Sequence, residues 1–501
     1  MKMSLTDPFL LTPAEAAAAD RETDASGIPI FHLMQQAGFA VAAEALRHFA
    51  QAERFVVLCG PGNNGGDGFV AASALRRAGA NVSIHLAGRP EELTGAARLA
   101  WLEAQTPAQS FSSYQPHPGD VIIDAIFGAG LSRDVPPEVT DLITRVREVG
   151  CPVLAVDLPS GIDGLTGQVR GAAFQAQRTV TFVARKPGHV LMPGRIYCGE
   201  ISLAPIGMPT RIARRHARTV SVNDPRAWKA AINVQQGDTH KYKRGHLAVF
   251  SGGPSHTGAA RMTASAGLCA GAGLVTLASP PDATLVNACA MTAVMVREIA
   301  DLQDLKMWWA SGKISAAVIG PGFGVGEGLR SYVHASAARP MVLDADAITA
   351  FAERPDELFA LAAGSEPRQI LTPHEGEFAR LFPDLAADKT IGKLERAKRA
   401  AERAHAVIVY KGADTVIAAP DGRLLINENA PAWLATAGSG DVLAGIAGAN
   451  LAQGIPAFEA AAAAVWLHGE AGNKAGVGMT AEDLIRHIPA ALEDLLSWCR
   501  L

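Results

Sequence analysis

The chain of 501 residues lacks several features that would indicate a nucleic-acid-binding, membrane or secreted protein. Its formal net charge is only −4, so it has no strong positive field to attract nucleic acid or an anionic membrane. No segment stays uncharged long enough to cross a bilayer, and the first twenty residues contain no apolar stretch typical of a signal peptide. We therefore expect a soluble, cytoplasmic protein that binds neither nucleic acid nor membrane.

Cysteine is also scarce, and its spacing excludes the common metal and redox motifs. None of the six cysteines forms a C-x-x-C pair, and no cysteine and histidine stand at zinc-site spacing. A reducing compartment fits this usage best, with the cysteines acting as small, buried apolar residues. The six are Cys59, Cys151, Cys198, Cys269, Cys289 and Cys499.

Aromatic residues make up only 6% of the chain, whereas glycine occurs 50 times and alanine is abundant. Small residues allow helices to pack closely on a sheet, so this composition favours an α/β fold. The length exceeds what one hydrophobic core usually supports, and it predicts two or three domains.

In the first half, short β-branched runs alternate with helical patterns. Helices are expected near residues 12–24, 28–50, 67–78 and 137–149, and strands between them, which predicts a doubly wound, Rossmann-like parallel sheet. The alternation lapses near residues 208–240, where an arginine cluster is interpreted as a solvated linker. It then resumes, so we expect an α/β domain over residues 1–215 and a larger one over residues 225–501.

Residues 60–65 satisfy G-x-G-x-x-G, the dinucleotide fingerprint, at the end of an apolar run. No acidic residue stands at the end of the next strand to bind a ribose, although Arg89 leaves NADP open. Asn63, Asn64 and Asp67 place side-chain oxygens where a pyrophosphate needs bare backbone, and such oxygens suit a hard cation. The bland alternative is a tight strand-to-helix turn.

Two further loops follow expected strands. Asp124 ends one strand and is followed by the glycine-rich turn 128–134, whose amides could hold phosphate; Asp157 ends the next, with Ser160 on its turn. Carboxylates gathered at one sheet edge need a cation, a donor or a proton between them. Alone, each aspartate would more often be a cap or turn residue.

In the second half, "TAGSGD" precedes a helical pattern. Gly438, Ser439 and Gly440 would leave amides facing an anion at the helix start, and Asp441 beside them could accept a hydroxyl proton during phosphoryl transfer. The P-loop class is excluded, because alanines at 259 and 260 replace its lysine and hydroxyl residue after a correctly spaced glycine pair.

The motifs "LTPAEAAAAD", "LMQQAG", "GNNGGDG", "DAIFGAG" and "VDLPSGIDG" resemble the YjeF N-terminal family, the NAD(P)H-hydrate epimerases, over residues 10–208. The resemblance implies K⁺ binding at Asn64, Asp124 and Ser160, and a substrate-contacting acid/base role for Asp157. Gln35 departs from the family's usual glutamate, outside the core loops. The implied hydrate-binding residues are Asn63, Asn64, Gly65, Gly66, Asp67, Gly128, Ala129, Gly130, Leu131, Ser132, Arg133 and Asp134.

The motifs "VIGPGFG", "VLDADAI", "LTPHEGEFARL", "VYKGADTVI" and "WLATAGSGDVLAGIAG" resemble the ribokinase-like superfamily, and within it the YjeF C-terminal, ADP- or ATP-dependent NAD(P)H-hydrate dehydratases, over residues 225–498. The resemblance implies Asp441 as catalytic base, and Mg²⁺ with the nucleotide, which Glu375 and Glu377 could help to place through water. The implied hydrate contacts are Gly273, Gly322 and His374. The implied nucleotide contacts are Lys411, Gly412, Ala413, Asp414, Thr415, Gly438, Ser439 and Gly440.

Together the two resemblances predict a bifunctional homo-oligomeric enzyme that repairs NADHX and NADPHX, with ADP favoured over ATP. At C6 of the hydrated ring, loss of hydroxide or ring opening would allow epimerisation; phosphorylation and elimination would restore the nicotinamide. Three alternatives stay open: a small-alcohol kinase that releases a stable ester, a first domain that only binds ligand, and, as the weakest, a dehydrogenase.

Overall fold

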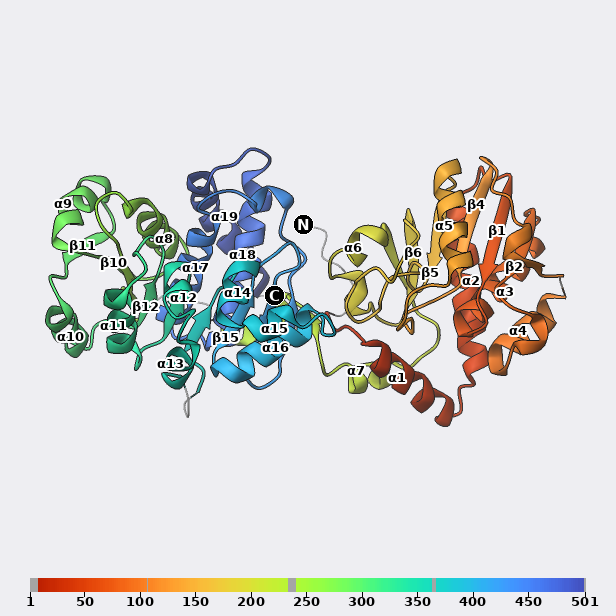
Figure 1. The fold of residues 1–501 in the computed structure, drawn as a ribbon, viewed down its shortest axis with the longest axis horizontal. Helices are drawn as coiled ribbons and strands as arrows, with labels where there is room; N and C mark the ends of the chain where they lie inside the picture. The colour runs from red at the N-terminus through yellow and green to blue at the C-terminus, as the bar shows by residue number, and fades with distance from the viewer. Residues whose placement is uncertain (1–7, 106, 233–239, 363–365, 500–501) are drawn as a thin grey trace. The chain divides into compact units, whose positions relative to one another are not determined.

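The computed structural model describes residues 8–105, 107–232, 240–362 and 366–499. Its internal contacts divide the chain into two compact units, residues 1–221 and residues 222–501. Each unit is built around one sheet flanked by helices (Figure 1). The prediction of two α/β domains is confirmed at this level, and the break falls among the residues 216–224 that the predicted boundaries left unassigned.

The first unit has a seven-stranded sheet in the order β3-β2-β1-β4-β5-β6-β7, and every pairing is parallel. The strands are β1 (Arg54–Cys59), β2 (Val82–Leu86), β3 (Gln109–Ser110), β4 (Asp120–Ala125), β5 (Val153–Val156), β6 (Arg178–Phe182) and β7 (Glu200–Ala204). Its helices are α1 (Pro13–Ala25), α2 (Ile30–His48), α3 (Asn63–Arg77), α4 (Gly95–Ala104), α5 (Pro137–Val149), α6 (Gly194–Tyr197) and α7 (Thr210–His216), with a short 3₁₀ turn η3 (Pro187–His189).

Strand β1 shows why this sheet must be covered on both faces. Phe55 and Val57 lie in a core shared with α2 and α3, whereas Val56 and Leu58 lie in a second core shared with α5. Successive side chains of a strand point to opposite faces, so a run that is apolar at every position needs helices on each side. The continuous apolar pattern of the sequence therefore specifies the doubly wound arrangement.

The second unit has a ten-stranded sheet in the order β11-β10-β9-β12-β13-β14-β15-β16-β17-β8. The pairings from β11 to β15 are parallel, and β16 and β17 continue as antiparallel neighbours. The strands are β8 (Ser221–Val222), β9 (His246–Phe250), β10 (Leu274–Ser279), β11 (Met295–Glu298), β12 (Ala316–Ile319), β13 (Met341–Leu343), β14 (Gln369–Leu371), β15 (Val407–Tyr410), β16 (Val416–Ala418) and β17 (Leu424–Ile426).

One group of helices in this unit buries alanine- and glycine-rich faces against the sheet. Residues of α8, α17, α18 and α19 share one core with the strands, and α17 is buried along almost its whole length. The helices are α8 (Thr257–Cys269), α9 (Pro281–Ala290), α10 (Leu302–Ala310), α11 (Glu327–Ser336), α12 (Asp346–Thr349), α13 (Pro355–Ala360), α14 (Glu375–Leu381), α15 (Pro383–Ala387), α16 (Lys393–Ala404), α17 (Ser439–Ala452), α18 (Ala457–Ala475) and α19 (Ala481–Cys499).

The basic segment after residue 208 is not simply a solvated linker, as the sequence suggested. It forms α7, which buries Ile212 and Ala213 and packs against α1. Arg215 forms an ion pair with Glu22 of α1 at 2.5 Å. The helix escaped prediction because it has only seven residues and two buried apolar positions. Residues 233–239 of the expected loop lie outside the described residues.

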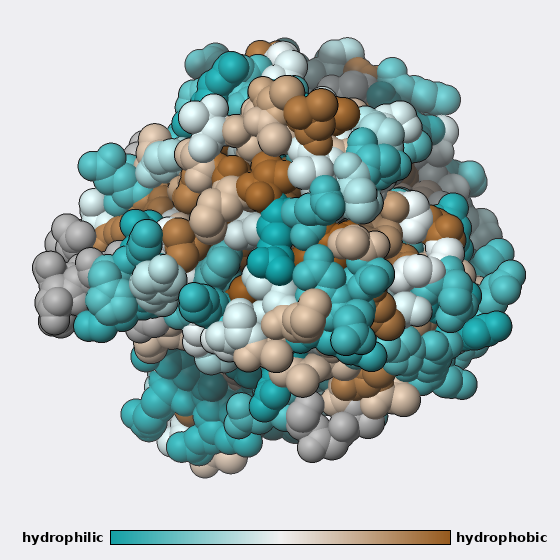
Figure 2. Space-filling view, turned by 90° about the vertical axis from the view of Figure 1, so that its left-hand side faces the viewer, coloured by the Kyte–Doolittle hydropathy of each residue, from teal (hydrophilic) through white to brown (hydrophobic). Residues whose placement is uncertain are grey.

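Some apolar side chains are exposed at one end of the second sheet. Leu285 on α9, Met295 on the edge strand β11 and Met307 on α10 are all exposed. Figure 2 faces this side and shows apolar surface interspersed with hydrophilic surface. The expected homo-oligomer stays a prediction.

In the described part of the chain, no helix is long and apolar enough to cross a membrane.

Candidate functional site

A cavity of about 640 Å³ opens in the first unit where β1, β4, β5 and β6 end. All three polar loops expected from the sequence reach it, and α1, α2 and the turn after β6 complete its wall. Its polar and glycine lining includes Asp20, Asn63, Asn64, Asp67, Gly128, Gly130, Ser132, Arg133, Asp157 and Lys186. The placement at the carboxyl edge of the sheet is where open α/β sheets bind ligands.

The fingerprint glycines pack two loops together. A Cβ on Gly60 would lie 1.9 Å from the carbonyl oxygen of Ile126, and a Cβ on Gly65 would lie 1.9 Å from that of Gly60. A Cβ on Gly66 would meet Met34 at 2.5 Å. Gly65 and Gly66, both predicted to contact the hydrate, are buried helical positions that do not line the cavity. Close packing explains these glycines without a pyrophosphate.

The polar residues that alternate with these glycines belong to a helix rather than to a loop. Helix α3 begins at Asn63, four residues earlier than expected, so Asn63, Asn64 and Asp67 occupy its first two turns. All three line the cavity. A sequence rich in asparagine and glycine reads as a turn, but its close packing against the β4 loop favours helix here.

Asp124 and Ser160 are joined in a buried network. The Ser160 hydroxyl donates to Asp124 Oδ1 at 2.6 Å, and the Ser160 N–H donates to Oδ2 at 2.7 Å. The hydroxyl oxygen also accepts from the Phe127 N–H at 2.8 Å. Burial raises the pKa of Asp124 to about 6, against the opposing hydrogen bonds from Ser160. The structure thus unites two of the three predicted cation ligands.

The third predicted ligand, Asn64, lies on the cavity wall beside the same loop. A Cβ on Gly128 would lie 3.0 Å from Asn64 Oδ1 and 3.1 Å from Asp157 Oδ2, so these two oxygens approach one point. The Asn64 Nδ2 is buried without a hydrogen-bond partner among the described residues. Across all the residues that the structure describes, no cluster of three or more His, Cys, Asp or Glu side chains could hold a metal.

Asp157 is held from several directions and has an unusual backbone. Its φ is +62°, a left-handed conformation that aspartate and asparagine tolerate better than most residues. Oδ1 accepts from Lys186 Nζ at 2.6 Å and from the Thr181 hydroxyl at 2.9 Å, while Oδ2 accepts from the Ala129 N–H at 2.9 Å. Burial opposes ionisation, but Lys186 and the other contacts outweigh it and lower the pKa of Asp157 to about 2.

His189 fixes the backbone around this pair. Its Nδ1 accepts from the Lys186 N–H at 2.8 Å, so Nε2 carries the proton and donates to the Asp157 carbonyl at 2.7 Å. Burial and the charge of Lys186 lower the pKa of His189 to about 4. The imidazole is therefore neutral at physiological pH.

Two further carboxyl groups face the same space. Burial, followed by the charges of Asp157 and Asp20, raises the pKa of Asp67 well above its ordinary value. Burial also raises the pKa of Asp20, on α1, despite the opposing charge of Lys186. The cavity therefore combines a strongly ionised carboxylate with carboxyl groups that hold their protons more tightly.

The 128–134 loop contributes unequally. Gly128 to Arg133 line the cavity, whereas Asp134 is exposed outside it. The Ala129 amide already serves Asp157. The predicted hydrate contact at Asp134 is therefore not among the cavity-lining positions, because the chain turns outward after Arg133.

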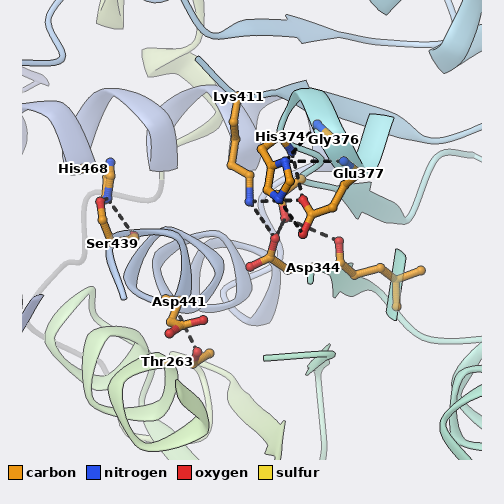
Figure 3. Close-up of polar contacts among 11 residues, drawn as sticks. Thr263, Asp344, His374, Gly376, Glu377, Lys411, Ser439, Asp441 and His468 are labelled. Atoms are coloured by element: carbon orange, nitrogen blue, oxygen red, sulfur yellow. Dashed lines mark hydrogen bonds and ion pairs between the residues drawn. The ribbon is translucent and has the colours of Figure 1, made fainter. Parts of the chain in front are cut away.

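In the second unit, a charged group surrounds the start of α17. The helix begins at Ser439, after Gly438 with φ +83°, and so Asp441 lies in its first turn. Lys411 Nζ, from the end of β15, donates to Asp344 Oδ1 at 2.9 Å and lies 3.7 Å from Glu377 Oε2. Figure 3 shows Lys411 pointing toward Asp344 and Glu377.

No lysine among the described residues forms an ion pair with Asp441. Burial, followed by the charge of Asp344, raises the pKa of Asp441 to about 6, although Lys411 opposes this. The Thr263 hydroxyl on α8 donates to the Asp441 carbonyl oxygen at 3.0 Å and fixes the helix start against α8. A carboxyl with a pKa near neutrality beside a helix N-terminus can accept a proton close to a bound anion.

Ser439 turns away from that anion position. Its N–H donates to the Thr436 carbonyl at 3.3 Å, and its hydroxyl lies 3.1 Å from His468 Nε2. Burial lowers the pKa of His468 to about 4, so the ring is neutral at physiological pH. The Ser439 amide, which was expected to bind an anion, is thus already hydrogen-bonded within the protein. Gly440 lies closer to the charged group, because a Cβ there would lie 3.6 Å from Lys411 Nζ.

His374 caps α14. Its Nδ1 accepts from the Gly376 N–H at 3.0 Å, and its own N–H donates to Glu377 Oε2 at 2.9 Å. Its side chain is 56% exposed and therefore open to a ligand, although Nε2 also lies 3.4 Å from Glu377 Oε1. Glu375 is exposed and accepts from the Tyr410 hydroxyl at 2.6 Å.

The "KGADT" segment follows β15 at the carboxyl edge. Gly412 and Ala413 are exposed, which leaves their backbone open to a ligand. The Thr415 hydroxyl donates to the Gly412 carbonyl at 2.9 Å, and Asp414 accepts from Lys393 at 2.6 Å. These contacts hold the turn in shape.

Gly273 does not join this group. It precedes β10, and its N–H donates to the Arg244 carbonyl at the amino edge of the parallel sheet. Gly322 instead follows β12 at the carboxyl edge, where a Cβ would lie 2.6 Å from the His256 carbonyl just before α8. Gly273, a predicted hydrate contact, therefore lies at the amino edge of the sheet, away from the charged group. Gly322 lies at the carboxyl edge, where that group is.

The sequence analysis missed Lys186 and Asp20 in the first site and assigned no role to Asp344 in the second. Lys186 follows β6 in "ARKPGH", so the rule that drew attention to carboxylates at strand ends would have found it if applied to cations. Gln35, the departure from the family pattern, donates to Glu103 of α4 at 3.3 Å and lies outside the cavity.

Comparison with known proteins covers both units. The family model described as YjeF-related protein N-terminus matches residues 31–188. The family model described as NAD(P)H-hydrate dehydratase matches residues 247–490. The bifunctional NAD(P)H-hydrate repair enzyme Nnr of Moorella thermoacetica is 35% identical, covering 97% of each chain. Its namesake from Escherichia coli is 33% identical, covering 92% of this chain and 89% of its own.

Among solved structures, an ADP/ATP-dependent NAD(P)H-hydrate dehydratase from Bacillus subtilis, co-crystallized with ATP/Mg²⁺, is 24% identical with a TM-score of 0.46. The match covers 55% of this chain and 98% of that one. The full-length relatives extend over both units, in the same order as the two family models. The chain belongs to the family of bifunctional NAD(P)H-hydrate repair enzymes.

Proposed function

We propose that the first unit epimerises the R and S forms of hydrated NADH and NADPH, and that the second dehydrates the S form at the expense of ADP or ATP. Family membership over nearly the full length supports this function. The observation that carries it in the structure is Asp441, with its raised pKa, at the start of α17 beside Lys411 and Asp344. We take residues 1–215 and 225–501 as the two functional domains.

In the second site, Asp441 accepts the proton of the C6 hydroxyl as that oxygen attacks the terminal phosphoryl group of the nucleotide. The bond from this phosphorus to the bridging oxygen breaks, and AMP leaves from ADP, or ADP from ATP. Lys411 and the amides at the start of α17 offset the negative charge of the transferring group. Phosphate then leaves C6 as the ring nitrogen supplies its lone pair, and loss of a proton from C5 to the departing phosphate or to water restores the reduced nicotinamide. No second set of catalytic side chains is needed for this elimination.

The oxygen ligands around Lys411 fit Mg²⁺ bound together with a nucleotide. Asp344 and Glu377 supply buried carboxylates, and Mg²⁺ commonly takes one or two of these with phosphate oxygens and water. When bound, the ion neutralises phosphate charge. We propose that Gly440 and the 411–415 turn hold the nucleotide, that Gly322 and His374 face the hydrate, and that ADP is preferred.

In the first site, Asn64, Asp124 and Ser160 would hold K⁺. Their amide, carboxylate and hydroxyl oxygens are ligands of a hard cation, and the convergence of Asn64 Oδ1 on the Gly128 turn fits such a site. When bound, the ion adds positive charge beside the substrate. Ionised Asp157 lies on the same wall and, within reach of the hydrate, orients it and stabilises positive charge on the ring.

The proposal is tested with the two hydrate epimers supplied separately to the full chain, with ADP or ATP. The S form with nucleotide should regain the absorbance of reduced nicotinamide at once, and the R form only through prior epimerisation. A stable phosphate ester in place of NAD(P)H would indicate a kinase instead. Failure to use the R form would indicate a first unit that only binds ligand.

A further inference from the structure

Lys186 is the one ammonium group on the inner wall of the first cavity, among the described residues that line it. The other lining cation, Arg133, is exposed at the 128–134 loop. Lys186 is 5% exposed and yet borders the cavity, so its charge is shielded from bulk solvent while remaining accessible to a bound ligand. Such burial of a lysine is uncommon unless the charge is paired.

The ammonium is held by graded contacts. Nζ lies 2.6 Å from Asp157 Oδ1, 3.0 Å from Thr181 Oγ1 and 3.4 Å from the Phe182 carbonyl oxygen. The first two are good hydrogen bonds, whereas the third is long. A lysine ammonium has three donor positions, so the weakly used one is available to a substrate oxygen.

The surrounding groups favour a positive centre on the substrate. Ionised Asp157, just after β5, contacts Lys186 directly. Asp67 on α3 and Asp20 on α1 also interact with its charge but hold their protons more tightly, and His189 is neutral. If Lys186 gives up its proton and the substrate becomes a cation, the total charge of the cavity is unchanged. The Asp157 carboxylate that faced an ammonium then faces the substrate cation, so little desolvation penalty is added.

We propose that Lys186 is the general acid of the epimerase site, donating the proton that lets the C6 hydroxyl leave the hydrated nicotinamide ring as water. This inference rests on the proposed epimerisation and selects hydroxide loss over ring opening. The proton moves from Nζ to the hydroxyl oxygen, the C6–O bond breaks with its electron pair on that oxygen, and the ring-nitrogen lone pair becomes the N1–C6 π bond.

The return step restores every atom. A water molecule adds to the other face of C6, the C6–O bond forms, and the π pair returns to the ring nitrogen. The surplus proton of the added water passes to solvent in the cavity, and the neutral amine of Lys186 takes up a proton from solvent. Asp157 orients the amine throughout and needs no protonation.

Lys186→Arg separates this role from that of a structural partner for Asp157. Arginine retains the positive charge and the ion pair, but its pKa above about 12 prevents it from donating a proton efficiently. We expect kcat for epimerisation to fall about 10²–10⁴-fold, the range for a positioned acid, with KM changed less than threefold. Retention of more than a tenth of the wild-type kcat in a folded variant would overturn the proposal.

The control is Lys474→Arg, which changes an exposed lysine paired with Asp494 at 2.7 Å in the second unit. It should epimerise like the wild type. Dehydration of the S form by each variant, measured in the same chain, reports whether the protein is intact and whether the hydrate assay works. A wild-type chain that cannot use the R form at all would contradict the proposed function, independently of Lys186.

If Lys186→Arg does not fold, Lys186→Ala is assayed with added methylamine and ethylamine. Restoration of epimerisation that increases with amine concentration supports proton donation at this position. A folded alanine variant that no amine restores would refute it, because a small amine can replace a missing proton donor but not a missing packing contact.

Discussion

The two sites use the same residue types, an aspartate near a lysine at the carboxyl edge of a parallel sheet, and tune them in opposite directions. In the first unit Lys186 contacts Asp157 directly, and the pKa of that carboxyl falls to about 2. In the second unit Lys411 is engaged by Asp344, and the pKa of Asp441 rises to about 6. A carboxylate that contacts the lysine directly stays ionised and is a poor base. A carboxylate left without that contact, such as Asp441, keeps a raised pKa and can accept a proton.

Exchange of Asp441 for asparagine should have a large effect on the rate of dehydration. Dehydration of the S form should fall about 10²–10⁴-fold, since the proton acceptor is gone, while epimerisation is unchanged. The folded state holds the Asp441 proton more tightly than the unfolded chain, so ionisation costs stability as pH rises from about 4 to about 6. At pH 7.5 the variant should therefore be more stable, by about 3 kcal/mol or less.

Calorimetry and NADH formation test these two effects together. Equal stability of variant and wild type at pH 7.5, or a gain that persists below pH 4, would contradict the raised pKa of Asp441. Loss of both activities would indicate that the substitution damages more than the second site.

Asp157→Asn should change stability in the opposite direction. Asparagine accepts the left-handed backbone at this position, but it leaves Lys186 buried without a charge partner, at a cost of about 3–5 kcal/mol. Epimerisation should be abolished and dehydration of the S form kept. Hydrogen exchange at β5 and β6 provides the local measurement, with α17 as internal reference. Unchanged protection there would show that the ion pair contributes little.

The pH dependence of the two activities should separate them. Below pH 6, dehydration is expected to fall about tenfold per pH unit, because Asp441 becomes protonated and cannot accept the hydroxyl proton. Asp157 stays ionised down to about pH 2, so its protonation gives no acid limb in the same range; the stability it contributes is lost only as pH falls from about 4 through 2. Initial rates with each epimer between pH 5 and 8 measure both profiles.

Gly128→Ala is the mildest test. The added Cβ would lie 3.0 Å from Asn64 Oδ1 and 3.1 Å from Asp157 Oδ2, so these side chains must shift by a few tenths of an ångström. A fewfold loss of epimerisation is expected, with dehydration unaffected. Gly130→Ala is the matched control, since its Cβ would meet no atom within 4 Å. Equal effects of the two changes would argue against crowding of the oxygens.

Much of this arrangement follows from the sequence, because strand periodicity is local. The continuous apolar runs indicate a covered parallel sheet, and parallel strands bring residues such as Asp124 and Asp157 to one edge whatever the loops do. What the sequence cannot give is which side chains then pair. Lys186 and Asp20 reach the cavity from segments far apart in the chain, and α1 lies before the residues matched by the family model.

Errors of detail have similar causes. Helix α3 starts early because packing of Gly65 and Gly66 outweighs their poor helix propensity. Gly273 belongs to a family motif but precedes its strand, so it lies at the amino edge of the parallel sheet. The Ser439 N–H donates a hydrogen bond to the Thr436 carbonyl, which the motif alone does not predict. The start of α3 and the bond of Ser439 depend on contacts that the residue pattern alone does not encode.

The backbone of Asp157 restricts which amino acids can replace it. At φ +62° most side chains are strained, and β-branched ones most of all, which leaves aspartate, asparagine and glycine as comfortable occupants. Two of these three remove the negative charge. Single substitutions that preserve the shape of this turn therefore remove the carboxylate that the epimerase site needs. In a library randomised at position 157, we expect aspartate clones to be active and nearly all others to be inactive, whether they fold or not.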